Sequence, residues 1–238
     1  MLNQMKSIIY SLLLGALVLS SCDDGRIEEE DINLVEDGRV AKLDVQLEGQ
    51  ASWPSGYAIS IAGFSEDSPY AQITKSIRTD KNGQASVTLS GIPENVKTLE
   101  ICVINSIRRR IVSFYTMEAP NTNDTIRINA GSLNVGMYAS IQKQIFDKQC
   151  AHCHSGSAWS ASLNLNEGVS YANMKNEASK LVEGKNRVTP GNAENSVLYE
   201  TLASDVSANW KHDHSKIMIT DPVGLQLIKD WINNGAEE

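Results

Sequence analysis

The sequence predicts two folded regions of different class, an N-terminal all-β sandwich and a C-terminal all-α domain. Three observations support this. Apolar and polar residues alternate with period two across residues 38–133, between short turn-forming runs. Apolar positions follow a helical period across residues 134–238. A chain of 238 residues also has room for two modest domains.

The first 21 residues predict a signal peptide. Lys6 supplies a positive charge ahead of an apolar run, Ile8 to Leu19, which is too short to span a bilayer comfortably. The run ends in Leu19–Ser20–Ser21–Cys22, which resembles the lipobox of bacterial lipoproteins, where cleavage precedes an acylated cysteine. An ordinary secretory signal with a chance cysteine is the alternative. We therefore expect residues 1–21 to be removed and Cys22 to anchor the protein in a membrane.

An acidic segment follows the expected anchor. Residues 22–37 contain Glu28–Glu29–Glu30–Asp31 and few apolar positions, so they cannot bury enough surface to offset the entropy of ordering. This composition predicts a flexible tether. We expect the protein to lie in the cell envelope, lipid-anchored to the outer membrane, on either the periplasmic face or the cell surface.

The region 38–133 predicts about seven short strands, typical of an immunoglobulin- or transthyretin-like sandwich. Cys102 is expected to be a small core residue of one strand. No cluster of chemically active residues marks a site here, so this region is interpreted as a spacer or a binding module for a protein or glycan. The expected strands are Lys42–Leu47, Tyr57–Phe64, Gln72–Arg78, Gln84–Leu89, Thr98–Ile104, Ile111–Met117 and Thr125–Ile128.

The region 134–238 predicts helices at both of its ends. The first carries an apolar stripe and leads directly into Cys150. The last is expected to be capped by Asp221, to start at Pro222 and to stop near Gly235. The apolar stripes consist of Tyr138, Ile141 and Ile145 in the first helix and Leu225, Ile228 and Ile232 in the last.

The candidate site is the segment Cys150–Ala151–His152–Cys153–His154, which contains Cys-x-x-Cys-His. Two thiols three positions apart can add across the two vinyl groups of a haem, and the histidine that follows then becomes an axial ligand of the iron. This pattern predicts one covalent haem c, bound through Cys150, Cys153 and His154.

The two cysteines have three interpretations other than haem attachment. A structural disulfide would close a tight loop and leave His154 unexplained. A thioredoxin-like redox pair needs a βαβ setting, which the pattern does not predict. A zinc site would need four ligands in a tetrahedral arrangement. Its candidates are Cys150 and Cys153 with two of His152, His154, His212 and His214.

Residues 139–236 resemble the class I c-type cytochrome domains found in planctomycete and Bacteroidetes proteins. The resemblance implies a small all-α fold in which the first and last helices cross beside the haem, with Phe146 and Trp231 at the crossing. The segments that carry it are Ile145–Phe146, Cys150–His154, Val188–Asn192, Ser196–Tyr199, Lys216–Met218 and Leu227–Ala236.

The resemblance also implies a methionine as the second axial ligand, and Met218 occupies the matching position. Related sequences commonly place proline directly after this methionine, whereas Ile219–Thr220–Asp221 intervene here before Pro222. His212 and His214 are therefore alternative ligands, and an open sixth position is a further alternative.

Four residues near the motif carry lesser expectations. Pro190 is expected to supply a carbonyl near His154, and Arg187 a cation near a haem propionate. Trp159 and Trp210 are expected to be general core residues.

The expected function is one-electron transfer by a monohaem c-type cytochrome at the cell envelope, with an unknown redox partner. A formal net charge of −8 excludes nucleic acid as the partner, and Arg108–Arg110 is too short a basic run to change this. No catalytic residue set is evident, so we expect no enzymatic activity of its own. The alternative is a surface binding or assembly lipoprotein whose haem domain is a redox or gas sensor.

Overall fold

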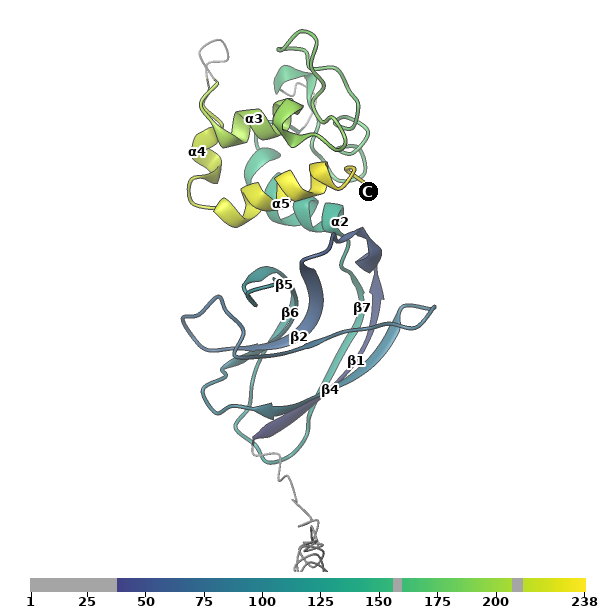
Figure 1. The fold of residues 1–238 in the computed structure, drawn as a ribbon, viewed down its shortest axis with the longest axis vertical. Coiled ribbons are helices and arrows are strands. Elements are labelled where there is room, and N and C mark those ends of the chain that lie inside the picture. Colours follow the sequence, from purple (N-terminus) through teal and green to yellow (C-terminus); the bar gives the residue numbers. More distant parts are fainter. Residues whose placement is uncertain (1–37, 156–159, 207–211) are drawn as a thin grey trace, which may run out of the picture. The chain divides into compact units, whose positions relative to one another are not determined.

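The structure is a computed structural model (Figure 1), in which a β region is followed by a helical region, both within the unit Glu36–Glu238. The expected signal peptide, the lipidated Cys22, the tether 22–37, Trp159 and Trp210 lie outside the described residues. No helix in the described part of the chain is long and apolar enough to cross a membrane. The described residues are 38–155, 160–206 and 212–238.

The N-terminal region is a β-sandwich of two sheets, as the alternation predicts. One sheet has the strand order β4-β1-β7 and the other β3-β2-β5-β6. Strand β1 pairs antiparallel with β4 and parallel with β7, and the second sheet is antiparallel throughout. The strands are β1 (Arg39–Glu48), β2 (Tyr57–Phe64), β3 (Ile73–Ser76), β4 (Gln84–Ile92), β5 (Thr98–Asn105), β6 (Arg110–Glu118) and β7 (Ile126–Asn134).

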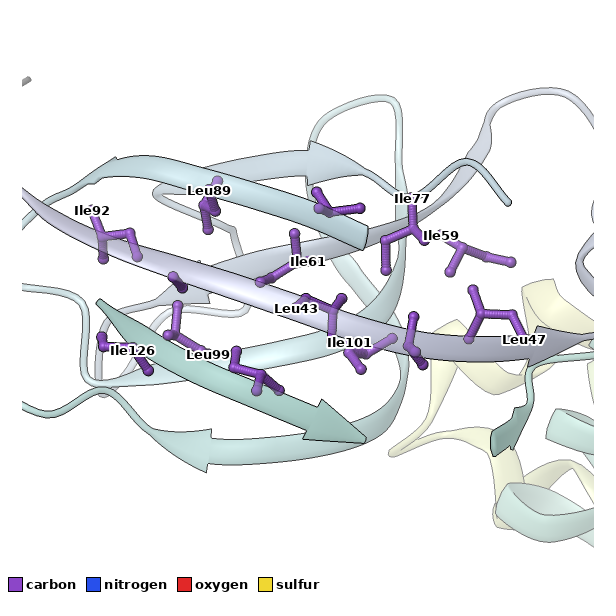
Figure 2. Close-up of a cluster of buried hydrophobic side chains, with 14 of the residues drawn as sticks. Leu43, Leu47, Ile59, Ile61, Ile77, Leu89, Ile92, Leu99, Ile101 and Ile126 are labelled. Carbon is purple, nitrogen blue, oxygen red and sulfur yellow. The ribbon is translucent and has the colours of Figure 1, made fainter. Parts of the chain in front are cut away.

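The core of the sandwich follows directly from the period-two pattern. In β1, residues at odd positions are buried and those at even positions from Lys42 onward are exposed, because successive side chains point to opposite faces of a sheet. Leu43, Ile61 and Leu99 are fully buried, and they lie together between the strands in Figure 2. Burial of these branched apolar side chains is the main stabilising contribution to this half of the chain.

Cys102 is a core residue of β5, as expected. Its side chain is fully buried, in a small cluster that includes Phe64 and Ile104. Burial, and to a smaller extent Glu100, raises the pKa of the Cys102 thiol to about 12, while Arg110 opposes this rise. Cys102 is therefore a packing residue without an accessible thiolate.

The C-terminal region is a small set of helices. Helix α5 is capped as predicted, since Asp221 Oδ1 accepts a hydrogen bond of 2.8 Å from the backbone N–H of Gly224 and Pro222 is the first helical residue. The longer elements are α2 (Met137–Ile141), η2 (Gln142–Cys150), α3 (Val197–Ala203), α4 (Ser215–Met218) and α5 (Pro222–Asn233). Single 3₁₀ turns are η1 (Gln50–Ser52), η3 (Ser160–Ser162) and η4 (Ala193–Asn195).

A second apolar core joins the first and last helices of this region. Phe146 and Trp231 are both buried in it, at 0% and 2% exposure. The ring of Tyr138 connects them, with centroids 6.4 Å from Phe146 and 5.2 Å from Trp231. Aromatic pairs at these separations stabilise a core beyond the area that they bury.

Polar contacts join the two regions within the same compact unit. The Trp53 Nε1–H donates to the carbonyl of Val135 at 2.6 Å, just before α2 begins. The Tyr57 hydroxyl donates to Asp230 Oδ2 in α5 at 2.5 Å. Burial and the neighbouring Asp230 carboxylate both raise the pKa of Tyr57, so this hydroxyl keeps its proton and its hydrogen bond.

Leu43→Ala should lower the free energy of unfolding by about 3 kcal/mol, because it leaves a cavity between the two sheets. Leu181→Ala is the matched control, since Leu181 is 53% exposed and its truncation should change stability by less than about 0.5 kcal/mol. Urea unfolding followed by circular dichroism measures both. Equal losses in the two variants would contradict the assigned core.

Candidate functional site

The Cys-x-x-Cys-His motif forms one tight turn at the end of η2. The backbone of η2 has a π-helical hydrogen-bonding pattern, which continues to a bond of 2.8 Å from the Ala151 N–H to the Phe146 carbonyl. The carbonyl of Cys150 then accepts from the N–H groups of both Cys153 and His154, at 3.1 and 3.0 Å. One carbonyl therefore draws the two thiols and the imidazole into the same turn, and π-helical segments are frequent at functional sites.

The two cysteines of this turn have different environments. Cys150 is half-buried against the apolar core of the helical region, whereas Cys153 is exposed, and both are free thiols. Burial, with a smaller contribution from Cys153, raises the pKa of Cys150 to about 12. A thioredoxin-like pair needs a thiol pKa below the ordinary value, so this environment disfavours that interpretation.

His154 is held by backbone groups of the loop that follows the motif. The residue is 9% exposed, and its Nδ1 lies 3.2 Å from the carbonyl oxygen of Ser160. A carbonyl can only accept, so a neutral ring with its hydrogen on Nδ1 fits this contact and would keep the lone pair of Nε2. The backbone of Leu163 is a second hydrogen-bonding neighbour of the ring. Burial lowers the pKa of His154, which favours the neutral ring that binds metals. The sequence led us to expect the Pro190 carbonyl beside His154, whereas the structure places the Ser160 carbonyl there.

Arg187 fixes the loop that carries this carbonyl. Its side chain is 8% exposed and donates from Nη1 to the Asn173 carbonyl at 2.7 Å. It donates from Nη2 to the carbonyls of Ala161 and Ser162, at 3.2 and 2.8 Å. Ala161 and Ser162 have φ values of 55° and 52°, which non-glycine residues adopt only when their surroundings hold them there. Arg187, expected beside a propionate, therefore serves to position the His154 loop.

A second link joins η2 to the chain after the motif. Gln142 is 3% exposed and donates from Nε2 to the Leu165 carbonyl at 2.9 Å. The N–H of Leu165 donates in turn to the His154 carbonyl at 2.7 Å. Sequence reasoning missed both Gln142 and Ser160, because these contacts depend on how the loop returns to the helix. A buried glutamine on an otherwise apolar stripe was the one signal available.

His214, which is 60 positions further along the chain, lies beside His154, and His212 lies beside His214. The ring centroid of His214 is 6.1 Å from that of His154, and the ring of His212 is 4.8 Å from that of His214. His214 is half-buried and directly precedes α4, whereas His212 is exposed. Burial, followed by the two neighbouring imidazoles, lowers the pKa of His214.

Met218 is the last residue of α4 and is 3% exposed. Its methyl group packs against the first turn of α5, where a Cβ added to Gly224 would lie 3.0 Å from Met218 Cε. The Met218 carbonyl accepts from the Asp221 N–H at 3.1 Å, so the turn between α4 and α5 is short and fixed. Met218 thus lies in the apolar core of the helical region.

These donors fit a haem c. Porphyrin supplies four nitrogens to its iron, so the protein need provide only the covalent thioethers and one or two axial ligands. Two thiols on one turn, the imidazole of His154 and a second imidazole nearby meet this requirement. Among the described residues, no group of three or more His, Cys, Asp or Glu is arranged to hold a metal ion by itself.

Comparisons with known proteins leave the chain without an assigned family. No protein-family model matches it, and no curated protein does. A 9R-lipoxygenase from Cyanothece PCC8801 is similar over 42% of this chain and 17% of its own, with 16% identity and a TM-score of 0.23. Phospholipase PlaB from Legionella pneumophila is similar over 41% of this chain and 25% of its own, with 14% identity and a TM-score of 0.21. This chain therefore spans a quarter or less of their lengths, and the likeness carries no argument about function.

Arg187→Met should destabilise the loop at residues 160–162, because the carbonyls of Ala161 and Ser162, together with that of Asn173, lose a charged donor. We expect the free energy of unfolding to fall by about 2 kcal/mol and amide exchange near Ser160 to quicken. Arg127→Met is the matched control, since Arg127 is exposed on β7. Urea unfolding and hydrogen–deuterium exchange are the measurements. Unchanged exchange in the loop would contradict the positioning role.

The haem-free protein should show a fixed order of thiol reactivity. At pH 8, iodoacetamide should modify the exposed Cys153 first, while Cys150 and Cys102 react far more slowly, because burial raises the pKa of each to about 12. Peptide mapping by mass spectrometry reads each site separately. Faster modification of Cys150 than of Cys153 would contradict the environments described here.

Proposed function

We propose that the protein is an envelope-anchored monohaem c-type cytochrome that carries one electron at a time. One haem c would be held by thioethers to Cys150 and Cys153, with His154 as the proximal ligand. The observation that carries this proposal is the 3.2 Å contact between His154 Nδ1 and the Ser160 carbonyl. With its hydrogen on Nδ1, the ring would offer Nε2 as the ligand beside two thiols on the same turn.

When bound, the haem supplies a redox couple between Fe(III) and Fe(II). The chain's own residues have separate tasks. The Ser160 carbonyl orients the His154 ring and increases the basicity of the ligating nitrogen. The apolar core around Phe146 and Trp231 excludes water, which is one of the ways in which a protein sets the reduction potential. Neither task requires a catalytic residue, and the proposal is of an electron carrier that is not an enzyme by itself.

The proposal gives each region a role. The helical region, residues 134–238, would be a small cytochrome c fold, and the sandwich, residues 38–133, an immunoglobulin- or transthyretin-like spacer or binding module for a protein or glycan. The lipidated Cys22 would hold the chain at the outer membrane, with the tether allowing the haem region to reach a redox partner of unknown identity.

Maturation of the full chain in a host with the c-haem attachment machinery tests this proposal. The purified protein should be red and give a c-type pyridine haemochrome with one haem per chain. Cys150→Ala and Cys153→Ala should each lose one thioether and shift the haemochrome band, and the double variant should lose covalent haem. Cys102→Ala is the matched control and should keep it, because Cys102 is a buried strand residue.

A colourless protein, from a host that matures other c-type cytochromes, would overturn the proposal. Zinc analysis of the same sample would then test the tetrahedral alternative.

A further inference from the structure

We infer that His214, and not Met218, is the second axial ligand, so that two imidazoles hold the iron. This inference rests on the proposed haem site and departs from the methionine that the resemblance implies. It is carried by the juxtaposition of His154 and His214, by a buried nitrogen of His214 without a partner, and by the position of Met218.

The first observation is the separation of the two rings. The centroids of His154 and His214 are 6.1 Å apart, with an angle of 37° between the ring planes. Imidazoles on opposite sides of one metal ion, with metal–nitrogen bonds of about 2.0 Å, have centroids about 6 Å apart. The fold therefore places these rings at a centroid spacing that matches bis-imidazole ligation.

The second observation is an unsatisfied polar atom. The Nδ1 of His214 is buried and has no hydrogen-bond partner among the described residues. A buried nitrogen without a partner costs about 1–3 kcal/mol, and such atoms in folded proteins often mark a missing ion or group. Iron ligated through this nitrogen would give it a partner, and the backbone of His212 also lies beside the ring.

The backbone around His214 is fixed, which a ligand position requires. Asp213 Oδ1 accepts hydrogen bonds from both the N–H and the Oγ of Ser215, at 3.0 and 2.6 Å. These contacts span His214 and set the start of α4. The His212 ring meets the His214 ring edge to face at 4.8 Å, which restricts its rotation.

The third observation is that Met218 is already used in packing. Its methyl group lies against Gly224 at the start of α5. His214 and Met218 are four positions apart, so their Cα atoms are separated by about one helical turn, roughly 5.4 Å along the axis. A ligand role for Met218 would compete with its packing in the apolar core.

Two functional consequences follow. Methionine ligation raises the reduction potential of a haem relative to bis-histidine ligation, so this protein would work at the lower potential. Its electron donor must then be a low-potential carrier. Ligands on both faces of the iron also leave no open position for a gas, which favours electron transfer over the sensor alternative.

The test compares four forms of the haem-loaded full chain: wild type, His214→Ala, His212→Ala and Met218→Leu. Near-infrared magnetic circular dichroism and electron paramagnetic resonance of the oxidised proteins identify the axial ligands. Wild type should give a bis-imidazole signature without the weak far-red band of a methionine–iron bond. That signature should be lost in His214→Ala and kept in His212→Ala and Met218→Leu. The wild-type spectra need no variant to fold, so the inference stays testable if a variant does not.

Three results would overturn the inference. A far-red band in wild type that Met218→Leu removes would make Met218 the ligand, and the proposed cytochrome function would stand. Loss of the signature in His212→Ala but not in His214→Ala would assign the other histidine, again with the function intact. Absence of covalent haem from the wild type would overturn the function and the inference together.

Discussion

The carbonyl of Cys150 imposes the constraint on which the rest of the site depends. It accepts hydrogen bonds from the N–H groups of both Cys153 and His154, so the two thiols and the imidazole share one turn. Cys150, which supplies this carbonyl, is the last residue of the π-helical element η2. The buried side chain of Phe146 anchors η2 to the apolar core. A local backbone arrangement is thereby tied to the packing of the first and last helices.

The positions of His154 and His214 are set by residues outside the motif. Arg187 holds the loop whose Ser160 carbonyl orients His154, and Asp213 fixes the backbone on either side of His214. The Arg187 and Asp213 contacts are hydrogen bonds between a charged group and the backbone, a kind that is stronger than average. The two imidazoles are thus positioned before any cofactor enters, which limits the reorganisation that haem binding and electron transfer would require.

Much of the fold was predictable because its signals are periodic or local. Alternation identified the strands around Leu43 and Ile61, and a capping aspartate with a following proline located the start of α5 at Pro222. Three features of the site were not predictable, because they depend on contacts between distant segments. These are the Ser160 carbonyl in place of Pro190, the backbone role of Arg187, and the approach of His214 to His154. The interpretation of Cys150, Cys153 and His154 as haem attachment residues remains a prediction from the motif.

The mass of the peptide that contains Cys150 and Cys153, taken from the mature full chain, tests the central claim most directly. The protein is produced with the c-haem attachment machinery, and a proteolytic peptide that contains Cys150 and Cys153 is weighed after denaturation. Covalent attachment predicts a peptide heavier by one haem. An unmodified peptide, from a host that loads its other c-type cytochromes, would contradict the account.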